Sequence, residues 1–173
     1  GWRGAGAQVL PFSPLADEAP DPTADAVYLP GGYPELHGAR LAASRRFLEG
    51  VRAAAARGAA VYGECGGYMV LGQALTDRAG ARHPMAGLLP VETSFAHPRL
   101  SLGYREIEAL AHGPLGAAGA RFRGHEFHYA ATVATAGSPL FRCRDGAGEA
   151  LGQAGCRDGT VGGSFIHLID AAA

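Results

Sequence analysis

The sequence has no excess of charge of either sign and no long apolar run. Its 173 residues carry 15 Lys and Arg against 16 Asp and Glu, a formal net charge of -1 at pH 7. Binding along a phosphate backbone depends on an excess of positive charge, so nucleic acid is not expected as a partner. No apolar run reaches the ~18 residues that a membrane-spanning helix requires, and we therefore expect no membrane partner.

A signal peptide and a cysteine framework are missing as well. The N-terminus lacks the charged, apolar and small-residue zones of a secretory signal, which favours the cytoplasm. The three cysteines, Cys65, Cys143 and Cys156, are odd in number and form no CxxC pair. Neither a disulfide framework nor a cysteine zinc site is predicted. The length fits one domain over residues 1–173, and Gly1 in place of Met indicates a piece of a longer protein.

The first half of the chain alternates strands and helices. Apolar runs and helical spacing place these elements at residues 7–12 (strand), 25–29 (strand), 41–57 (helix ending at Gly58), 59–62 (strand) and 68–75 (buried helix). Beyond residue 85 the β-rich segments are 103–110, 121–136 and 160–167, with a turn at 157–160. This order predicts an α/β fold, with a mainly parallel central sheet flanked by helices and added antiparallel strands.

Cys65 stands in a glycine-rich turn between the strand at 59–62 and the next helix. Gly63, Gly66 and Gly67 surround it, as small residues must where a strained turn presents a nucleophile. A helix that follows directly would favour the thiolate, and the Gly66 N–H would be free to hold an oxyanion. An isolated cysteine is more often a small buried hydrophobe, but such a residue needs no glycine on both sides.

A thiol nucleophile needs a base, and His167 is the best placed of the seven histidines. It ends a β-rich run about a hundred residues after Cys65, which is common for a Cys–His pair brought together by folding. A plain surface or core histidine is about as frequent at such a place. The loop Pro30-Gly31-Gly32 follows a strand, and Gly32 could offer a second oxyanion donor, although Pro-Gly-Gly is usually just a turn.

The segment 123–129 contains two histidines that invite a metal interpretation. His125 and His128 are three residues apart, which misses the helical HExxH pattern, and on a strand they would point to opposite faces. No metal site is therefore predicted. Glu126 and His128 would share a face, where they could line a polar, substrate-binding pocket. Alternatively that face is solvated, and Phe127 and His125 face the core.

Five motifs together resemble the C-terminal glutamine amidotransferase domain of cobyrinic acid, or hydrogenobyrinic acid, a,c-diamide synthases. They occur in order along nearly the whole chain, at residues 29–35, 62–69, 103–105, 123–129 and 164–168. The resemblance implies a class I glutamine amidotransferase fold in which Cys65 attacks glutamine and His167 raises its reactivity. It also implies a further strand before Gly1, so that the sheet of this chain would lack its first member.

The resemblance further implies a separate N-terminal synthetase domain that uses ATP and Mg²⁺ to activate the corrinoid's a and c carboxylates. No GxxxxGK[ST] phosphate loop occurs here, so no cofactor is expected in this chain. In the wider class a Glu two residues after the histidine orients it; Ile169 occupies that place, which favours a Cys–His dyad. The alternatives are another intracellular cysteine hydrolase of similar fold and an inert docking or regulatory module.

Overall fold

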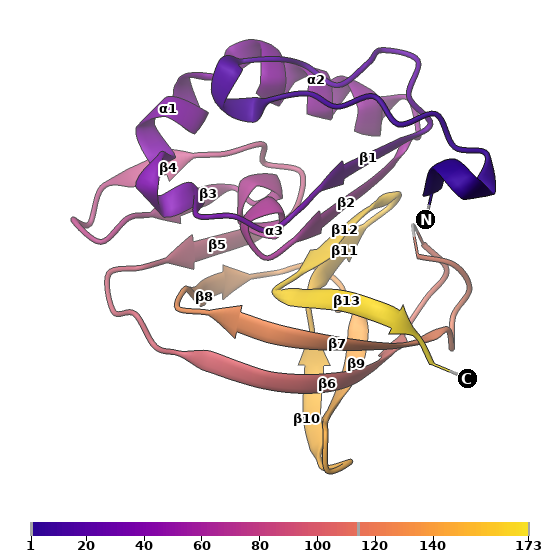
Figure 1. The fold of residues 1–173 in the computed structure, drawn as a ribbon. Coiled ribbons are helices and arrows are strands. Elements are labelled where there is room, and N and C mark those ends of the chain that lie inside the picture. Colours follow the sequence, from indigo (N-terminus) through magenta and orange to yellow (C-terminus); the bar gives the residue numbers. More distant parts are fainter. Residues whose placement is uncertain (1, 114, 173) are drawn as a thin grey trace.

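The computed structural model describes residues 2–113 and 115–172 and contains a parallel sheet that carries the helices (Figure 1). In this sheet β2 (Ala60–Glu64) lies between β1 (Ala26–Leu29) and β12 (Val161–Ser164), and both neighbours run parallel to it. The antiparallel strand β11 (Cys156–Asp158) completes the order β1-β2-β12-β11. The turn expected at residues 157–160 therefore joins two paired strands, as predicted.

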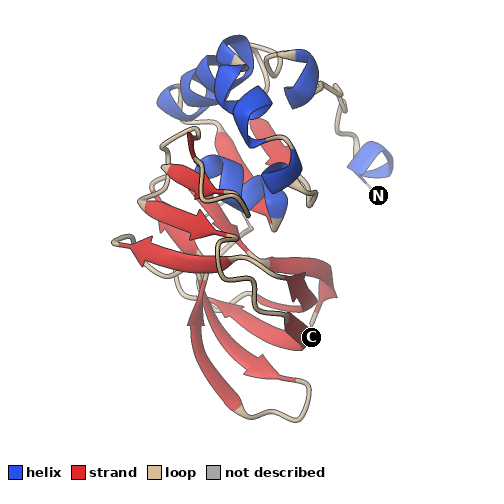
Figure 2. Ribbon diagram, turned by 90° about the vertical axis from the view of Figure 1, so that its left-hand side faces the viewer, coloured by secondary structure: helices blue, strands red, loops and turns tan. Residues whose placement is uncertain are grey.

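The helices occupy the upper half of the view in Figure 2, and the lower half consists of strands and loops. The helices are η1 (Trp2–Ala5), η2 (Pro14–Ala16), η3 (Pro34–Leu36), α1 (Gly38–Ala43), α2 (Arg45–Ala56) and α3 (Gly66–Leu71). The helix predicted over 41–57 is interrupted at Ser44, and Gly58 follows it with φ +84, a value that glycine adopts without strain. The prediction of a helix over 68–75 was too long, because α3 ends at Leu71 and Ala74 begins a strand.

Two further sheets contain the β-rich second half. The five-stranded antiparallel sheet has the order β10 (Ala150–Ala154), β9 (Phe141–Asp145), β6 (Ser101–Ala109), β7 (Arg121–His128) and β13 (Ile166–Ala171). The other has the order β4 (Arg82–Pro84), β3 (Ala74–Thr76), β5 (Val91–Ser94) and β8 (Ala131–Thr135). The segments predicted as continuous, 121–136 and 160–167, each divide between two sheets.

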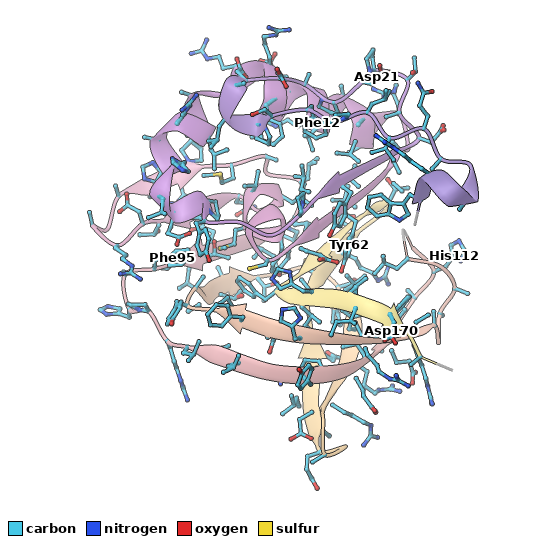
Figure 3. The ribbon with its side chains drawn as sticks, in the orientation of Figure 1. Phe12, Asp21, Tyr62, Phe95, His112 and Asp170 are labelled. Atoms are coloured by element: carbon cyan, nitrogen blue, oxygen red, sulfur yellow. The ribbon has the colours of Figure 1, made fainter. Side chains whose placement is uncertain are left out.

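Two apolar cores hold these layers together. The larger lies around the parallel sheet and its helices, where α2 buries Phe47 and Val51. The smaller joins the parallel sheet to the five-stranded sheet, and Figure 3 shows Tyr62 between the two. Because side chains alternate along a strand, β6 turns Ile107 into this smaller core and its even-numbered residues away from it. The five-stranded sheet therefore has one buried and one outer face.

The strand predicted at residues 7–12 is wrong: this segment is irregular. The segment does not pair with the parallel sheet. Together with β1 it lines a cavity of about 970 Å³. A run of apolar residues becomes a strand only where a neighbouring strand accepts its hydrogen bonds. Within the described residues β1 forms an edge of its sheet. The expected further strand before Gly1 stays a prediction.

Candidate active site

Cys65 occupies the sharp turn between β2 and α3, as the sequence predicted. Its backbone has φ 47 and ψ -104, and only one other non-glycine residue of the described chain has a positive φ. The surrounding glycines are required by close packing. A Cβ on Gly66 would lie 2.7 Å from the Gly32 nitrogen, and one on Gly67 would collide with the Leu29 carbonyl oxygen. The turn is therefore a strained elbow that the fold holds in place.

The thiol of Cys65 is buried, with 7% of the residue exposed. Burial raises its pKa, and the carboxylates of Glu35 and Glu64 act in the same direction. The backbone N–H groups of Gly66 and Gly32 interact with the sulfur and lower the pKa, but burial outweighs them. The expectation that the following helix favours the thiolate stays a prediction: α3 begins directly after Cys65, but burial opposes ionisation of the thiol.

His167 lies on β13 with its ring against the loop after β1. The closest approach is to Gly31, where a Cβ would collide with the imidazole Cε1 atom. The ring also stacks on His125, with centroids 4.9 Å apart and planes 12° from parallel. Burial, and then the charges of His125 and His128, lower the pKa of His167 below 6.5. The imidazole is therefore neutral at pH 7 and able to accept a proton.

The fold brings Cys65 and His167 to the same loop although about a hundred residues separate them. The Cys65 N–H donates to the Ser164 carbonyl oxygen at 2.8 Å, and Ser164 pairs with Glu64 in the parallel register. The chain leaves the parallel sheet at Phe165 and enters the five-stranded sheet, which places His167 against Gly31. Gly32, next to Gly31, contacts Gly66. The predicted site residues 32, 65, 66 and 167 thus gather at one place.

Glu64 is a site residue that sequence reasoning missed. It is 5% exposed, and its Oε2 atom lies 3.7 Å from Nδ1 of His167. Its Oε1 atom accepts a hydrogen bond from the Leu168 N–H at 3.3 Å. Burial raises the pKa of this carboxyl, against a lowering by the Tyr28 hydroxyl. The place two residues after His167 holds Ile169 and no carboxylate; this carboxylate comes instead from the residue directly before Cys65 in the sequence.

Glu35 is a second residue that was not singled out. Its Oε2 atom is buried and has no hydrogen-bond partner among the described residues. Its charge contributes to the raised pKa of Cys65, which places the carboxylate close to the thiol. Burial raises the pKa of Glu35 itself. A buried acceptor without a donor beside a nucleophile is a natural contact for an N–H group of a substrate. The signal in the sequence was its position, three residues after Gly32.

Glu126 and His128 share the inner face of β7, and the alternative of a solvated face was wrong. Arg105 donates to Glu126 from Nε at 2.8 Å, and His128 stacks on Phe165 with centroids 3.9 Å apart. Burial alone would raise the pKa of Glu126, but the nearby His128, whose Nε2 lies 3.9 Å from Oε1, and the hydrogen bond from Arg105 hold it below its usual value. Phe127, expected in the core under that alternative, is exposed. Substrate binding by Glu126 and His128 stays a prediction.

Other kinds of site find no support in the described part of the chain. Residues 2–113 and 115–172 contain no group of three or more His, Cys, Asp or Glu side chains arranged to hold a metal ion. The helices there are all too short or too polar to cross a membrane. Cys143 and Cys156 are buried free thiols in separate apolar cores. The groups that the structure does place together at Cys65 are a thiol, an imidazole, two carboxyl groups and backbone N–H donors.

Comparison with known proteins gives a consistent result along nearly the whole chain. Residues 3–172 match the family described as CobB/CobQ-like glutamine amidotransferase domain. The chain is 58% identical over 171 residues to hydrogenobyrinate a,c-diamide synthase of Brucella abortus, covering 98% of this chain and 38% of that protein. The protein of the same name from Mesorhizobium japonicum is 54% identical over 169 residues, covering 97% and 38%.

The fold has a match among solved structures. A crystal structure described as a glutamine amidotransferase superposes with a TM-score of 0.56 at 23% identity, covering 83% of this chain and 70% of the other. This likeness confirms the predicted fold class. The chain spans only about 38% of the length of the curated relatives that it matches.

Proposed function

The chain belongs to the family of CobB/CobQ-like glutamine amidotransferase domains, and we propose that it hydrolyses glutamine to glutamate and ammonia. The ammonia supplies ATP-dependent amidation of the a and c carboxylates of a corrinoid in cobalamin biosynthesis. The relatives are named hydrogenobyrinate a,c-diamide synthase, which favours hydrogenobyrinic acid over cobyrinic acid as the acceptor. The partner is the synthetase part of the same full-length enzyme, which would bind the ATP and Mg²⁺; this chain itself needs no cofactor.

The observation that carries this proposal is the elbow at Cys65, with backbone donors on one side and a neutral imidazole nearby. The N–H groups of Gly32 and Gly66 interact with the sulfur, so they also reach a carbonyl oxygen bound next to it. His167 borders the same loop through Gly31. A nucleophile, a base and two oxyanion donors are the parts that acyl transfer from an amide requires.

Burial raises the pKa of Cys65 and lowers that of His167, which favours a neutral thiol and a neutral imidazole as the starting pair. His167 accepts the thiol proton as the sulfur attacks the amide carbon of glutamine. The carbonyl electron pair moves to the oxygen, which the N–H groups of Gly32 and Gly66 hold. When the intermediate collapses, the C–N bond breaks, and the imidazolium returns its proton to the leaving ammonia.

Water completes the cycle. His167, neutral again, removes a proton from a water molecule that attacks the glutamyl thioester. The C–S bond breaks, the sulfur recovers a proton from the imidazolium, and glutamate leaves. His167 becomes an imidazolium both when the thiol attacks glutamine and when water attacks the thioester. The Glu64 carboxylate, 3.7 Å from Nδ1, stabilises this charged form. The Cys–His dyad is thereby assisted by a carboxylate from the residue before the nucleophile.

The direct test is Cys65→Ala in the full-length enzyme. Glutamine-dependent amidation should disappear while amidation from added ammonium persists, because the substitution removes only the ammonia-producing reaction. Cys143→Ala is the matched control, since that thiol is buried in the smaller core and should leave both activities in place. Loss of both activities, or of neither, in the Cys65 variant would contradict the proposal.

Covalent labelling distinguishes the rival functions. A glutamine-analogue alkylator should label Cys65 selectively, as peptide mass spectrometry would show. Slow labelling of all three cysteines alike would favour an inert docking or regulatory module. Peptide cleavage without glutamine hydrolysis would favour another kind of cysteine hydrolase.

A further inference from the structure

The outer face of the five-stranded sheet carries an exposed apolar cluster at one end. Leu102 pairs with Phe127 across β6 and β7, so their side chains lie side by side on this face, and Tyr104 follows two residues later. Leu102 is 64% exposed, Tyr104 72% and Phe127 47%. We call these three residues the apolar patch. Tyr129, which packs edge-on against Phe127, extends it.

The other end of the same outer face exposes charged side chains to water. There Glu108 lies 3.2 Å from Arg142 and 3.8 Å from Arg121, and Arg123 lies 3.6 Å from Asp170. Figure 3 shows Asp170 near the end of β13. Single exposed apolar residues are ordinary on a protein surface, but a contiguous group next to a charged array indicates a surface that another body covers.

The patch is continuous with the candidate active site. Tyr104 pairs with His125, and His125 pairs with His167, so the three lie in one row across β6, β7 and β13. His125 stacks on His167 and links the base to the patch. The loop after β1 adds two more exposed apolar side chains, Tyr33 and Leu36, near the same site. A body seated on the patch would therefore lie next to His167.

We propose that the patch is the surface on which the synthetase part of the full-length enzyme docks. This rests on the proposed function. About three fifths of the length of each relative lies outside the compared region, so a large further body belongs to the same protein. Ammonia released into neutral water is mostly protonated to ammonium, and only the small unprotonated fraction attacks an activated carboxylate, so that a high concentration of added ammonium is needed to replace it. Docking beside His167 keeps the ammonia out of water until it meets the acceptor.

The test compares coupling in the full-length enzyme. The double variant Leu102→Asp with Phe127→Asp places two charges in the patch without touching Cys65 or His167. Glutamine-dependent amidation should fall about tenfold or more, the size of effect that charging the centre of an interface produces. Glutamine hydrolysis and ammonium-dependent amidation should both persist, so that more glutamate forms for each amide made. Leu151→Asp, an exposed leucine on β10, is the matched control and should stay coupled.

Each other outcome contradicts the inference. If the double variant makes as much amide for each glutamine hydrolysed as the unchanged enzyme does, the inference is overturned. It is also overturned if the unchanged enzyme is a dimer in solution and the double variant is a monomer with the same ratio of amide to glutamate, because the patch would then bind a second copy of the chain. If the double variant unfolds, the milder double variant Leu102→Ser with Phe127→Ser is tested in its place. The ratio of amide to glutamate is measured in the same way, and an unchanged ratio would again overturn the inference. Failure of the proposed function is recognised separately, since Cys65→Ala would then leave glutamine-dependent amidation intact.

Discussion

The two sheets that meet at the site differ in how they hold their catalytic group. The parallel sheet holds Cys65 in a turn where Gly66 and Gly67 pack directly against backbone. The five-stranded sheet presents His167 from β13, with a quarter of its side chain exposed and its outer face open. The proposed nucleophile is thus part of the closed core, and the proposed base is at the border of an accessible surface. Substitutions around Cys65 in the parallel sheet should therefore impair folding, whereas substitution of His167 in the five-stranded sheet should impair only the chemistry.

Gly67→Ala should have the largest effect, because a Cβ there collides with the Leu29 carbonyl oxygen. Because the backbone of Leu29 cannot move aside at small energetic cost, we expect the free energy of unfolding to fall by about 3 kcal/mol. Glutaminase activity should be lost as well. Chemical denaturation of the full-length enzyme measures it. Gly4→Ala is the control, since a Cβ at Gly4 meets nothing within 4 Å. Equal stability of the two variants would show that the elbow is not tightly closed.

His167→Gln should abolish chemistry while leaving the fold intact. Removal of a general base typically lowers the rate ~10²- to 10⁴-fold, whereas a partly exposed side chain contributes little to stability. Steady-state glutamine hydrolysis and thermal unfolding, measured on the same preparation, separate the two effects. His97→Gln provides the comparison at an exposed histidine. A parallel fall in stability and activity would remove the distinction between the two sheets.

Glu64→Gln tests the carboxylate that bridges the two sheets. The amide oxygen still accepts from the Leu168 N–H, but the negative charge that faces His167 is gone. We expect kcat to fall about 10- to 100-fold, as for other residues that orient a catalytic group, with little change in KM. The acid limb of the rate profile should also move to lower pH, because the imidazolium loses a stabilising charge. An unchanged profile would assign Glu64 a purely structural role.

The smallest effect concerns pH. The pKa of His167 is lowered from 6.5, chiefly by burial, so the neutral base persists below the usual range for histidine. Activity should be fully present above pH 6.5 and be lost only as the pH falls through the lowered pKa of His167. The dependence of kcat/KM on pH reports this value for the free enzyme. A midpoint above 6.5 would show that the charge of Glu64 outweighs burial.

The sequence predicted the parts of the site that depend on local chain geometry. The elbow at Cys65 could be recognised because only glycine tolerates the close backbone contacts that Gly63, Gly66 and Gly67 make. The strand predicted at residues 7–12 was wrong for the opposite reason. Its apolar run has the pattern of a strand, but a strand forms only beside another strand, and the pattern of one segment does not show whether such a neighbour exists. The division of 160–167 between two sheets was likewise invisible, since both parts are β-rich.

The sequence by itself determined that Cys65 occupies a sharp turn and which class of fold surrounds it, because turns, periodicity and motifs are local properties. Only the tertiary structure decided that Glu64 faces His167, that Glu35 has a buried oxygen without a donor among the described residues, and that the patch lies in one row with His167. It also buried the Cys65 thiol, which raises the pKa of that group. Burial and contacts between distant residues set these properties, and neither is written in any short segment of the chain.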